Sequence, residues 1–399
     1  MLAFIGLVAF FWLVLYFYAS RFEGSYLNAV TPFFVVFFPA NFIIPILYLY
    51  VFDYSDELTS GVIYVYTGYL IYFFAFIFAF THYYKLSIEP RPIIQKTQNR
   101  TMMYVFLLLS ILFFLPVWAS FPEYFSEPRE FYKLTRDGYG IYYYSSLLFL
   151  FLYLVVSFFE KKNNIFYLLV FLFLAYFHGT KTAMVWGVLA YMMFNVYILN
   201  KKFSFKKSVI SIVIFSLLMV LAFYLTKEGG RELVLVLEAI IKYSDFSFNA
   251  IKVVDGFDKY FDHFFYGQLF IEDNVYSKLP RIFWEDKPRV YGSFNLASAV
   301  YPQWFALNIG DANFGLMGRP YVDFGWFGIL FIGLYGLFAG VVLRMSLQVF
   351  EKKRTPFVFV LVLFFSSLTF LPLGPVYPII EHLFIAFFVY FMYRLRLKL

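Results

Sequence analysis

Apolar runs recur along the whole chain, and short polar segments separate them. Most of the runs have about 17 to 23 residues, the length that an α-helix needs to cross a bilayer. The pattern therefore predicts an all-α polytopic membrane protein with about eleven transmembrane helices, within a range of ten to twelve. We expect these helices at residues 1–20, 30–52, 58–80, 101–121, 141–159, 165–178, 183–199, 208–226, 320–343, 355–371 and 379–393.

The distribution of Lys and Arg predicts the orientation of the chain. Six polar segments carry 18 of the 32 Lys and Arg residues but only four of the 25 Asp and Glu residues. Cytoplasmic loops are enriched in Lys and Arg, so we expect these segments on the cytoplasmic side. With eleven helices, the C-terminus then lies inside and the N-terminus outside. The six segments are residues 21–29, 85–100, 160–164, 200–207, 344–354 and 394–399.

The polar stretches on the opposite side define the domain organisation. We expect one membrane domain over residues 1–399, with a small external loop at 122–140 and a large external loop at 227–319 that holds the candidate active site. In the large loop, apolar positions at helical spacing over Arg231–Tyr243 predict a helix along the membrane surface. A second short helix is expected over Phe246–Val254, ended by Asp255 and Gly256.

Composition narrows the function classes. The chain has no Cys, which excludes disulfides and thiolate metal sites, and no spacing of His, Asp or Glu indicates a metal, so neither a metal nor a cofactor is expected. The net charge of +7 comes from the cytoplasmic segments, which argues against a nucleic-acid partner and for contact with membrane lipids. The 60 Phe and 36 Tyr residues reflect either AT-rich codons or a surface for stacking on sugars.

The large loop holds the densest cluster of cations. Arg281, Lys287 and Arg289 lie within nine residues, beside Pro280 and Pro288, which stiffen the backbone. Arg presents a planar fork that suits phosphate oxygens, and Lys adds a compact charge. The alternative is a solvated loop in which neighbouring carboxylates pair with these cations.

Two further cations stand beside predicted helix starts. Arg319 lies in the glycine-rich segment Gly315–Gly328, which leads into an inward-running helix, and Lys181 follows His178 and Gly179 in a turn before another such helix. Helix N-termini carry unpaired N–H groups and partial positive charge. Together with the cationic loop they predict an anion site that needs no metal. Alternatively, Arg319 reaches the interface beside a packed glycine segment, and Lys181 is an ordinary turn residue.

Several residues are candidates for proton transfer. His263 lies in an aromatic stretch of the large loop, Asp311 precedes the glycine-rich segment and Asp323 lies within it, and Glu381-His382 opens the last predicted helix. A His or carboxylate close to a hydroxyl can act as a general base. Each of them can equally be solvated or hydrogen-bonded locally.

Short motifs in these segments resemble the Wzy-type polymerases of O-antigen and exopolysaccharide repeat units. Pro280-Arg281 followed by Asp286-Lys287-Pro288 is similar to the family's PR…KP signature. The run from Gly318 to Gly328 resembles its glycine-rich helix start, and Gly179-Thr180-Lys181 stands where relatives often have Gly-Ser/Thr-Arg. The motif residues that carry the resemblance number about thirty, whereas the layout of helices and loops matches over most of the chain.

The resemblance implies a glycosyltransferase in the inner membrane of a bacterium, active on the periplasmic side. It would pass a growing glycan from undecaprenyl pyrophosphate to the next lipid-linked repeat unit. Arg281, Lys287, Arg289 and Arg319 would bind the pyrophosphate, with Lys181 in support, and the base would be His263, Asp311 or Asp323. The expected partners are undecaprenyl-pyrophosphate-linked oligosaccharides, membrane lipids and a chain-length regulator protein.

Two other functions stay open at this stage. An O-antigen ligase uses a similar donor and layout but transfers to lipid A-core. A polysaccharide flippase or transporter would have repeats, broken helices and ionisable groups in mid-membrane. Here the charges gather at the ends of the predicted helices, which favours an enzyme.

Overall fold

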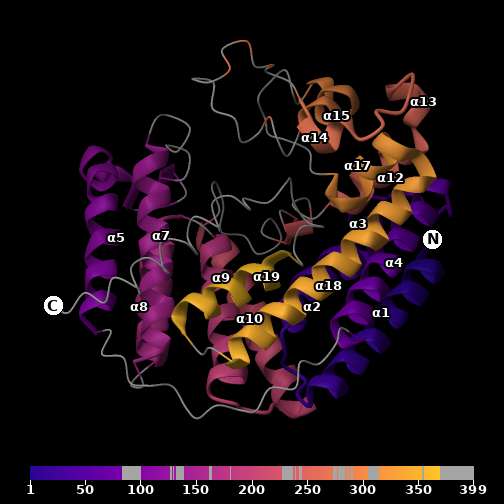
Figure 1. Ribbon diagram of the computed structural model, residues 1–399. Helices are drawn as coiled ribbons and strands as arrows, with labels where there is room; N and C mark the ends of the chain where they lie inside the picture. Colours follow the sequence, from indigo (N-terminus) through magenta and orange to yellow (C-terminus); the bar gives the residue numbers. More distant parts are fainter. Residues whose placement is uncertain are drawn as a thin grey trace.

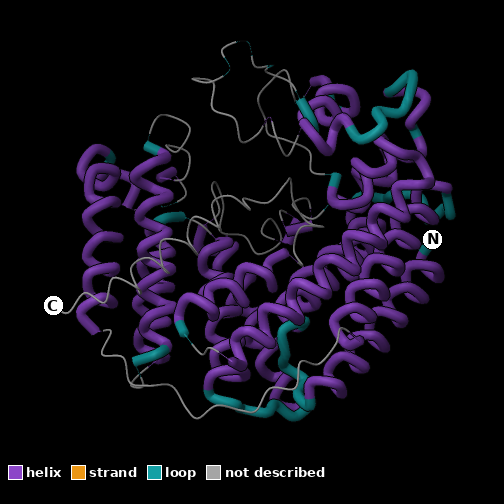
Figure 2. Tube along the Cα trace, viewed as in Figure 1, coloured by secondary structure: helices purple, strands orange, loops and turns teal. Residues whose placement is uncertain are grey.

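The chain is described from a computed structural model. The described residues are 1–82, 100–125, 128, 130–131, 139–160, 164–179, 181–226, 237–238, 240–241, 245–272, 276, 284, 286, 288, 291–303, 314–352 and 355–368. Every regular element among them is a helix, and no strand occurs there (Figure 2). The all-α prediction is therefore confirmed for this part of the chain.

Ten of the eleven predicted apolar runs coincide with helices. These are α1 (Leu2–Glu23), α2–η1–α3 (Thr31–Phe38, Pro39–Ile43 and Ile44–Val51), α4 (Ser60–His82), α5 (Arg100–Ser120), α7 (Gly140–Phe158), α8 (Asn164–Phe177), α9–η4 (Lys181–Met193 and Phe194–Ile198), α10 (Phe205–Thr226), α18 (Gly328–Lys352) and α19 (Pro356–Leu368). The eleventh run, residues 379–393, lies outside the described residues.

Six helical stretches of the described residues are long and apolar enough to cross a bilayer, and two shorter apolar helices accompany them. The protein is thus a multi-pass membrane protein whose described regular elements are all helices. The number of eleven spans stays a prediction.

Short helices fill the described parts between α10 and α18. They are α12 (Phe246–Asp255), α13 (Phe257–Tyr260), α14 (Gln268–Ile271), α15 (Ser293–Val300) and α17 (Gly315–Phe324), with the 3₁₀ turn η6 (Gly325–Phe327) before α18; a further 3₁₀ turn, η2 (Pro122–Phe125), follows α5. The expected helix over 246–254 is confirmed as α12, with Gly256 at its C-cap. The expected helix over 231–243 lies largely outside the described residues.

The helix expected at 320–343 begins later than predicted. Gly325 has φ +58° and ψ −140°, a conformation that a side chain would strongly disfavour, and it separates α17 from η6 and α18. Arg319 and Asp323 therefore lie in the short α17, and not at the first turn of the long helix α18, which starts at Gly328.

Figure 1 shows two groups of long helices. Helices α5, α7 and α8 stand side by side on the left, and α1, α4 and α18 run together on the right, with α9, α10 and α19 between the groups. Helices α12 to α15 and α17 gather at the upper end of the right-hand group, next to the start of α4.

Helices α4 and α18 form the closest pair, because glycine lets their backbones approach. A Cβ built on Gly336 or Gly340 would overlap the carbonyl oxygen of Tyr72 or Phe76, respectively. The two glycines are four residues apart, so they lie on one face of α18. Such small-residue faces allow close helix packing where lipid removes the hydrophobic drive for association.

Aromatic rings fill the space behind this pair. Trp12 of α1 stacks on Phe37 and Phe73, with ring centroids 4.8 and 4.0 Å away, and its indole N–H donates to the Tyr69 carbonyl at 3.2 Å. All three rings are fully buried. Part of the aromatic excess is therefore core packing.

Contacts between distant segments bring most of the expected cytoplasmic segments to one end of the molecule. Tyr26 N–H donates to the Phe203 carbonyl at 3.1 Å, and Arg344 pairs with Glu23 at 2.9 Å, which joins residues 21–29, 200–207 and 344. In the other group, Arg100 lies 3.5 Å from Glu160. The ring of Phe158, at the end of α7, stacks on Phe194 of η4 at 4.7 Å and so connects the two sets.

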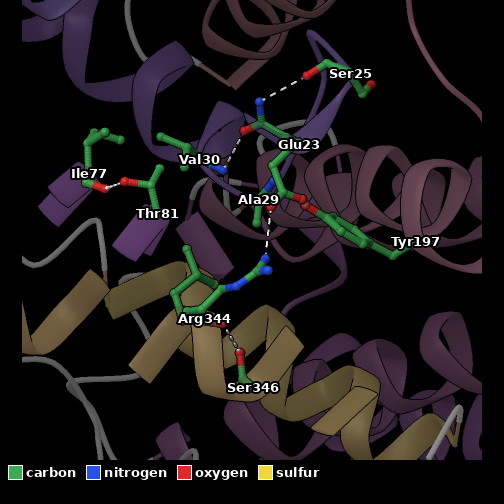
Figure 3. Close-up of polar contacts among 11 residues, drawn as sticks. Glu23, Ser25, Ala29, Val30, Ile77, Thr81, Tyr197, Arg344 and Ser346 are labelled. Atoms are coloured by element: carbon green, nitrogen blue, oxygen red, sulfur yellow. Dashed lines mark hydrogen bonds and ion pairs between the residues drawn. The ribbon is translucent and has the colours of Figure 1, made fainter. Parts of the chain in front are cut away.

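An ion pair between Glu23 and Arg344 connects several helices at the end where the expected cytoplasmic segments meet (Figure 3). Both side chains are almost buried, and Tyr197 donates to the second Glu23 oxygen at 3.1 Å while it accepts from Ala29 N–H at 2.8 Å. The Arg344 guanidinium also lies 5.2 Å from the ring centroid of Phe22. One ion pair thus joins α1, η4 and α18.

Replacing Gly340 with Ala should destabilise the protein. The new methyl must displace the Phe76 carbonyl, and overpacking of this kind costs about 1–3 kcal/mol. The thermal unfolding midpoint in detergent measures the effect. The control is Gly6→Ala in α1, where a Cβ meets nothing within 4 Å; equal midpoints for the two variants would contradict the close approach of α4 and α18.

Replacing Glu23 with Ala should also destabilise the protein, because it leaves a nearly buried Arg344 without its counter-charge at a cost of about 3 kcal/mol. Urea unfolding in mixed micelles measures the loss. The double variant Glu23→Leu/Arg344→Leu should regain most of it. If the double variant lost the sum of the two single effects, the pair would not act as a unit.

Candidate functional site

Helix α12 is fixed to the membrane core by polar bonds. Ser247 donates to the Asn41 side-chain oxygen at 3.0 Å, and the Tyr69 hydroxyl lies 3.0 Å from the Ser247 hydroxyl. The Tyr66 hydroxyl donates to the Asn41 carbonyl at 3.1 Å. These residues are all buried, so α12 is a rigid support for the short helices α13, α14, α15 and α17.

Asp323 holds α14 on α17, which itself packs on α12. Its side chain is 1% exposed, and its two oxygens accept the backbone N–H groups of Leu269 at 3.1 Å and Phe270 at 3.2 Å. The Asp323 carbonyl accepts from Tyr266 N–H at 2.8 Å. Gly267 lies between them at φ +91°, which permits the tight turn.

Glu272 closes the segment that carries the predicted cations. One of its oxygens accepts from Gly292 N–H at 2.7 Å and from the Asn295 amide at 3.2 Å, and the other accepts from the Gln268 amide at 2.6 Å. Glu272 is 6% exposed. The residues before and after 273–291 are therefore bonded to each other, beside α14 and the start of α15.

His178 organises the turn before α9. Its ring is buried, with Nε2 2.8 Å from the Ser146 hydroxyl and Nδ1 2.8 Å from the Leu174 carbonyl. The Tyr143 hydroxyl donates to the His178 carbonyl at 2.6 Å, and Gly179 adopts φ +63°. The turn therefore lies at the start of α7, opposite to the end where Arg100 meets Glu160.

Comparison with known proteins gives a relationship over nearly the whole chain. The chain is 31% identical over 400 aligned positions to proteins named O-antigen polymerase from Salmonella typhimurium and from Salmonella typhi, covering 98% of this chain and 94% of each relative. No protein-family model matches the chain, and no solved structure does.

The chain belongs to the O-antigen polymerase family. This relationship confirms the resemblance to the Wzy-type polymerases that the short motifs indicated. Because the aligned positions cover 98% of this chain, nearly all of the large polar region aligns with these relatives.

The predicted site residues fall into two groups in this family member. Lys181 is the first residue of α9, Arg319 is the half-buried fifth residue of α17, His263 is exposed beside Phe265, and Asp323 is buried beneath α14. Arg281, Lys287, Arg289 and Asp311 lie outside the described residues.

The starts of α9 and α17 pack against different helices. Helix α9 starts at the end opposite to Glu160, and α17 starts next to α12 and the beginning of α4. The orientation of these two starts relative to the membrane stays a prediction. Whether the five cations meet in one place stays a prediction.

The structural role of Glu272 is not predicted by the sequence. It follows a short apolar stretch with no motif, and its partners Gly292 and Asn295 are 20 and 23 residues away. Asn295 two residues after a Gly-Ser pair is an ordinary helix start. Only the folded chain reveals that this carboxylate joins the two ends of the cationic segment.

Replacing Glu272 with Ala should open that segment. The change removes three hydrogen bonds to a charged group, and each contributes about 1.5–3 kcal/mol. Trypsin cleavage within residues 273–291 should become about tenfold faster or more, as measured by mass spectrometry of the native protein in detergent. Glu57→Ala, an exposed carboxylate at the same end, is the control. Unchanged cleavage would show that Glu272 does not hold the segment.

Proposed function

We propose that this protein polymerises lipid-linked oligosaccharide repeat units at the outer face of the cytoplasmic membrane. It transfers the growing glycan from undecaprenyl pyrophosphate to the next lipid-linked repeat unit. The observation that carries the proposal is 31% identity over 98% of the chain to proteins named O-antigen polymerase. The same relationship favours polymerisation over ligation to lipid A-core and over transport.

The proposed chemistry needs positive charge where the donor bond breaks. As the anomeric carbon leaves the pyrophosphate oxygen, the electron pair and the negative charge stay on the lipid pyrophosphate. Fixed cations close to that oxygen stabilise the transition state more than the ground state. We assign this role to Arg281, Lys287, Arg289 and Arg319, with Lys181 in support; each charge-assisted bond contributes about 1.5–3 kcal/mol.

Two observations support a site at this end. Glu272 and Gly292 fix both ends of the segment that contains Arg281, Lys287 and Arg289, next to the α14 turn that Asp323 holds on α17. Arg319 belongs to α17, the helix whose Asp323 holds α14 next to this anchor.

The acceptor hydroxyl must lose its proton as the new glycosidic bond forms. His263, Asp311 and Asp323 remain the candidate bases. His263 is accessible from solvent, whereas the Asp323 oxygens already accept two backbone N–H groups. Among these two described candidates, His263 is therefore more accessible to a substrate hydroxyl.

Replacing Arg281 with Ala should abolish long polysaccharide, because the leaving pyrophosphate loses a bidentate partner. Cells that carry only this variant should display single repeat units on a polysaccharide gel, as should cells without the gene. Immunoblots of membranes check that the variant is inserted. Arg100→Ala, an exposed cation at the opposite end, should restore the full ladder. A gene deletion that removes all attached polysaccharide would instead indicate a ligase or a flippase.

Replacing Arg319 with Lys should reduce chain length less than replacing it with Ala, because Lys keeps the charge at that position in α17. The length distribution of the polysaccharide on gels measures both variants at matched protein levels. Equal loss in the two would indicate that the fork geometry of Arg, and not its charge, is required.

A further inference from the structure

Three carboxylates of the described polar region, Asp255, Glu272 and Asp323, hold segments of the fold in place. Asp255 accepts from the Ser60 hydroxyl at 3.0 Å and from Gly61 N–H at 2.7 Å, which caps the start of α4. Asp323 and Glu272 hold α14 and α15, as described above. Asp245 is different, because it occupies the N-cap of α12 but makes no side-chain bond to the N–H groups of that helix.

A short chain of side chains orients Asp245. The Tyr301 hydroxyl donates to the Asn249 side-chain oxygen at 2.6 Å, which leaves the Asn249 amide nitrogen to hydrogen bond with the Asp245 carboxylate. Asn249 is 3% exposed, so its amide has little freedom to turn. The half-buried Asp245 carboxylate is therefore held by a buried amide that a phenol fixes in place.

Burial raises the pKa of the Asp245 carboxyl to about 6, and the hydrogen bond to Asn249 opposes only part of that rise. A carboxylate has about four acceptor positions on its two oxygens. Among the described residues its partners are the Asn249 side chain and its own backbone N–H. Asp245 can therefore accept further hydrogen bonds from a ligand.

Aromatic rings stand beside this carboxylate. Phe248 stacks on Tyr48 with centroids 4.4 Å apart, and Tyr54 meets the same ring edge-on at 4.8 Å. Tyr54 is 41% exposed. The Lys252 ammonium lies 4.1 Å above the Tyr301 ring. A carboxylate, an amide and an exposed phenol beside aromatic faces suit a sugar, whose hydroxyls donate hydrogen bonds and whose C–H face stacks on rings.

The position of the cluster suits a lipid-linked sugar. Tyr48 lies near the end of the span Thr31–Val51, where Tyr50 and Val51 are 74% and 48% exposed. These outward apolar residues mark the edge of the bilayer, so the cluster lies at headgroup level. It also lies at the same end as α17 and the Glu272–Gly292 contact.

We propose that Asp245, Asn249, Tyr301 and Tyr54 form a sugar-binding subsite, in which the Asp245 carboxylate accepts a hydrogen bond from a hydroxyl of the lipid-linked repeat unit. The inference deepens the proposed function and rests on it, since that function supplies the oligosaccharide. Tyr301 and Asn249 act as positioning residues for Asp245, and Tyr54 offers its ring to the sugar face.

Binding of the repeat-unit oligosaccharide to the purified full-length protein tests the subsite. The probe is the lipid-free oligosaccharide released by mild acid from the lipid-linked pool of the same cells, and saturation-transfer NMR in micelles gives its affinity. Asp245→Asn should weaken binding about tenfold or more at neutral pH, because a neutral amide replaces a charged acceptor. Asn caps helices as well as Asp, so α12 should stay folded.

The pH dependence separates a binding role from a structural one. The wild-type affinity should fall about tenfold between pH 7.5 and 5, as the carboxylate takes up a proton, and Asp245→Asn should show no such fall. The titratable groups beside Asp245 are Tyr48 of α3 and Tyr301, and those beside its partners are Tyr54, Asp255, Tyr260 of α13 and Lys252. Burial raises the pKa values of Tyr54 and Tyr301 and lowers that of Lys252. Lys252→Met should therefore keep the wild-type pH profile.

Three further variants complete the test. Tyr301→Phe should weaken binding severalfold but keep the pH profile, since it frees Asn249 without removing the carboxylate. Asp258→Asn, an exposed carboxylate of α13 with the same loss of charge, should bind like the wild type. Tyr54→Ala should weaken binding without changing the pH profile.

Unchanged affinity and pH profile for Asp245→Asn would overturn the subsite, as would a wild-type protein that polymerises but does not bind the oligosaccharide. The polysaccharide ladder of wild-type cells is scored separately. A missing ladder with intact, Asp245-dependent binding would refute polymerisation and leave the sugar site standing, so the two failures are distinguishable.

Discussion

The close approach of α4 and α18 is the constraint on which the polar region depends. Lipid gives two apolar helices no hydrophobic reason to associate, so contact requires small residues, and Gly336 and Gly340 supply them. The beginning of α4 binds the end of α12, because Gly61 N–H donates to Asp255. On the other side, η6 connects α17 to α18. If the two long helices separated, the two surfaces that support α14 and α15 would move apart with them.

Three carboxylates, the buried Asp323 and Glu272 and the exposed Asp255, add rigidity to this region beside its own apolar cluster. Asp255, Asp323 and Glu272 each accept backbone N–H groups at the start of a helix, and each joins segments that are distant in the chain. Bonds to charged groups are stronger than neutral ones, and helix N-termini favour negative charge. The result is a frame of short helices that is held without disulfides, in a chain without Cys.

The sequence predicts the long helices well, because length and apolarity alone decide whether a segment can cross a bilayer. It also predicts α12, whose apolar spacing and terminal Asp255-Gly256 are local signals. It fails at α17, since the break at Gly325 depends on a backbone conformation that the apolar pattern does not reveal. The tasks of Asp323, Glu272 and Asp245 were equally hidden, because their partners lie far away in the chain or are set by tertiary packing. From the sequence alone, a carboxylate with a structural role therefore looks the same as a carboxylate that could act on a substrate.

The contact between Glu272 and Gly292 has an evolutionary consequence. The hydrogen bond of 2.7 Å from Gly292 N–H to Glu272 holds the two ends of the stretch 273–291 together. A change in the length of that stretch therefore need not alter α14 and α15, which carry its ends. Insertions beside the cations assigned to the pyrophosphate would therefore leave the Glu272–Gly292 contact and its helices in place. The same arrangement makes 273–291 a natural unit for exchange between relatives in chimeric proteins.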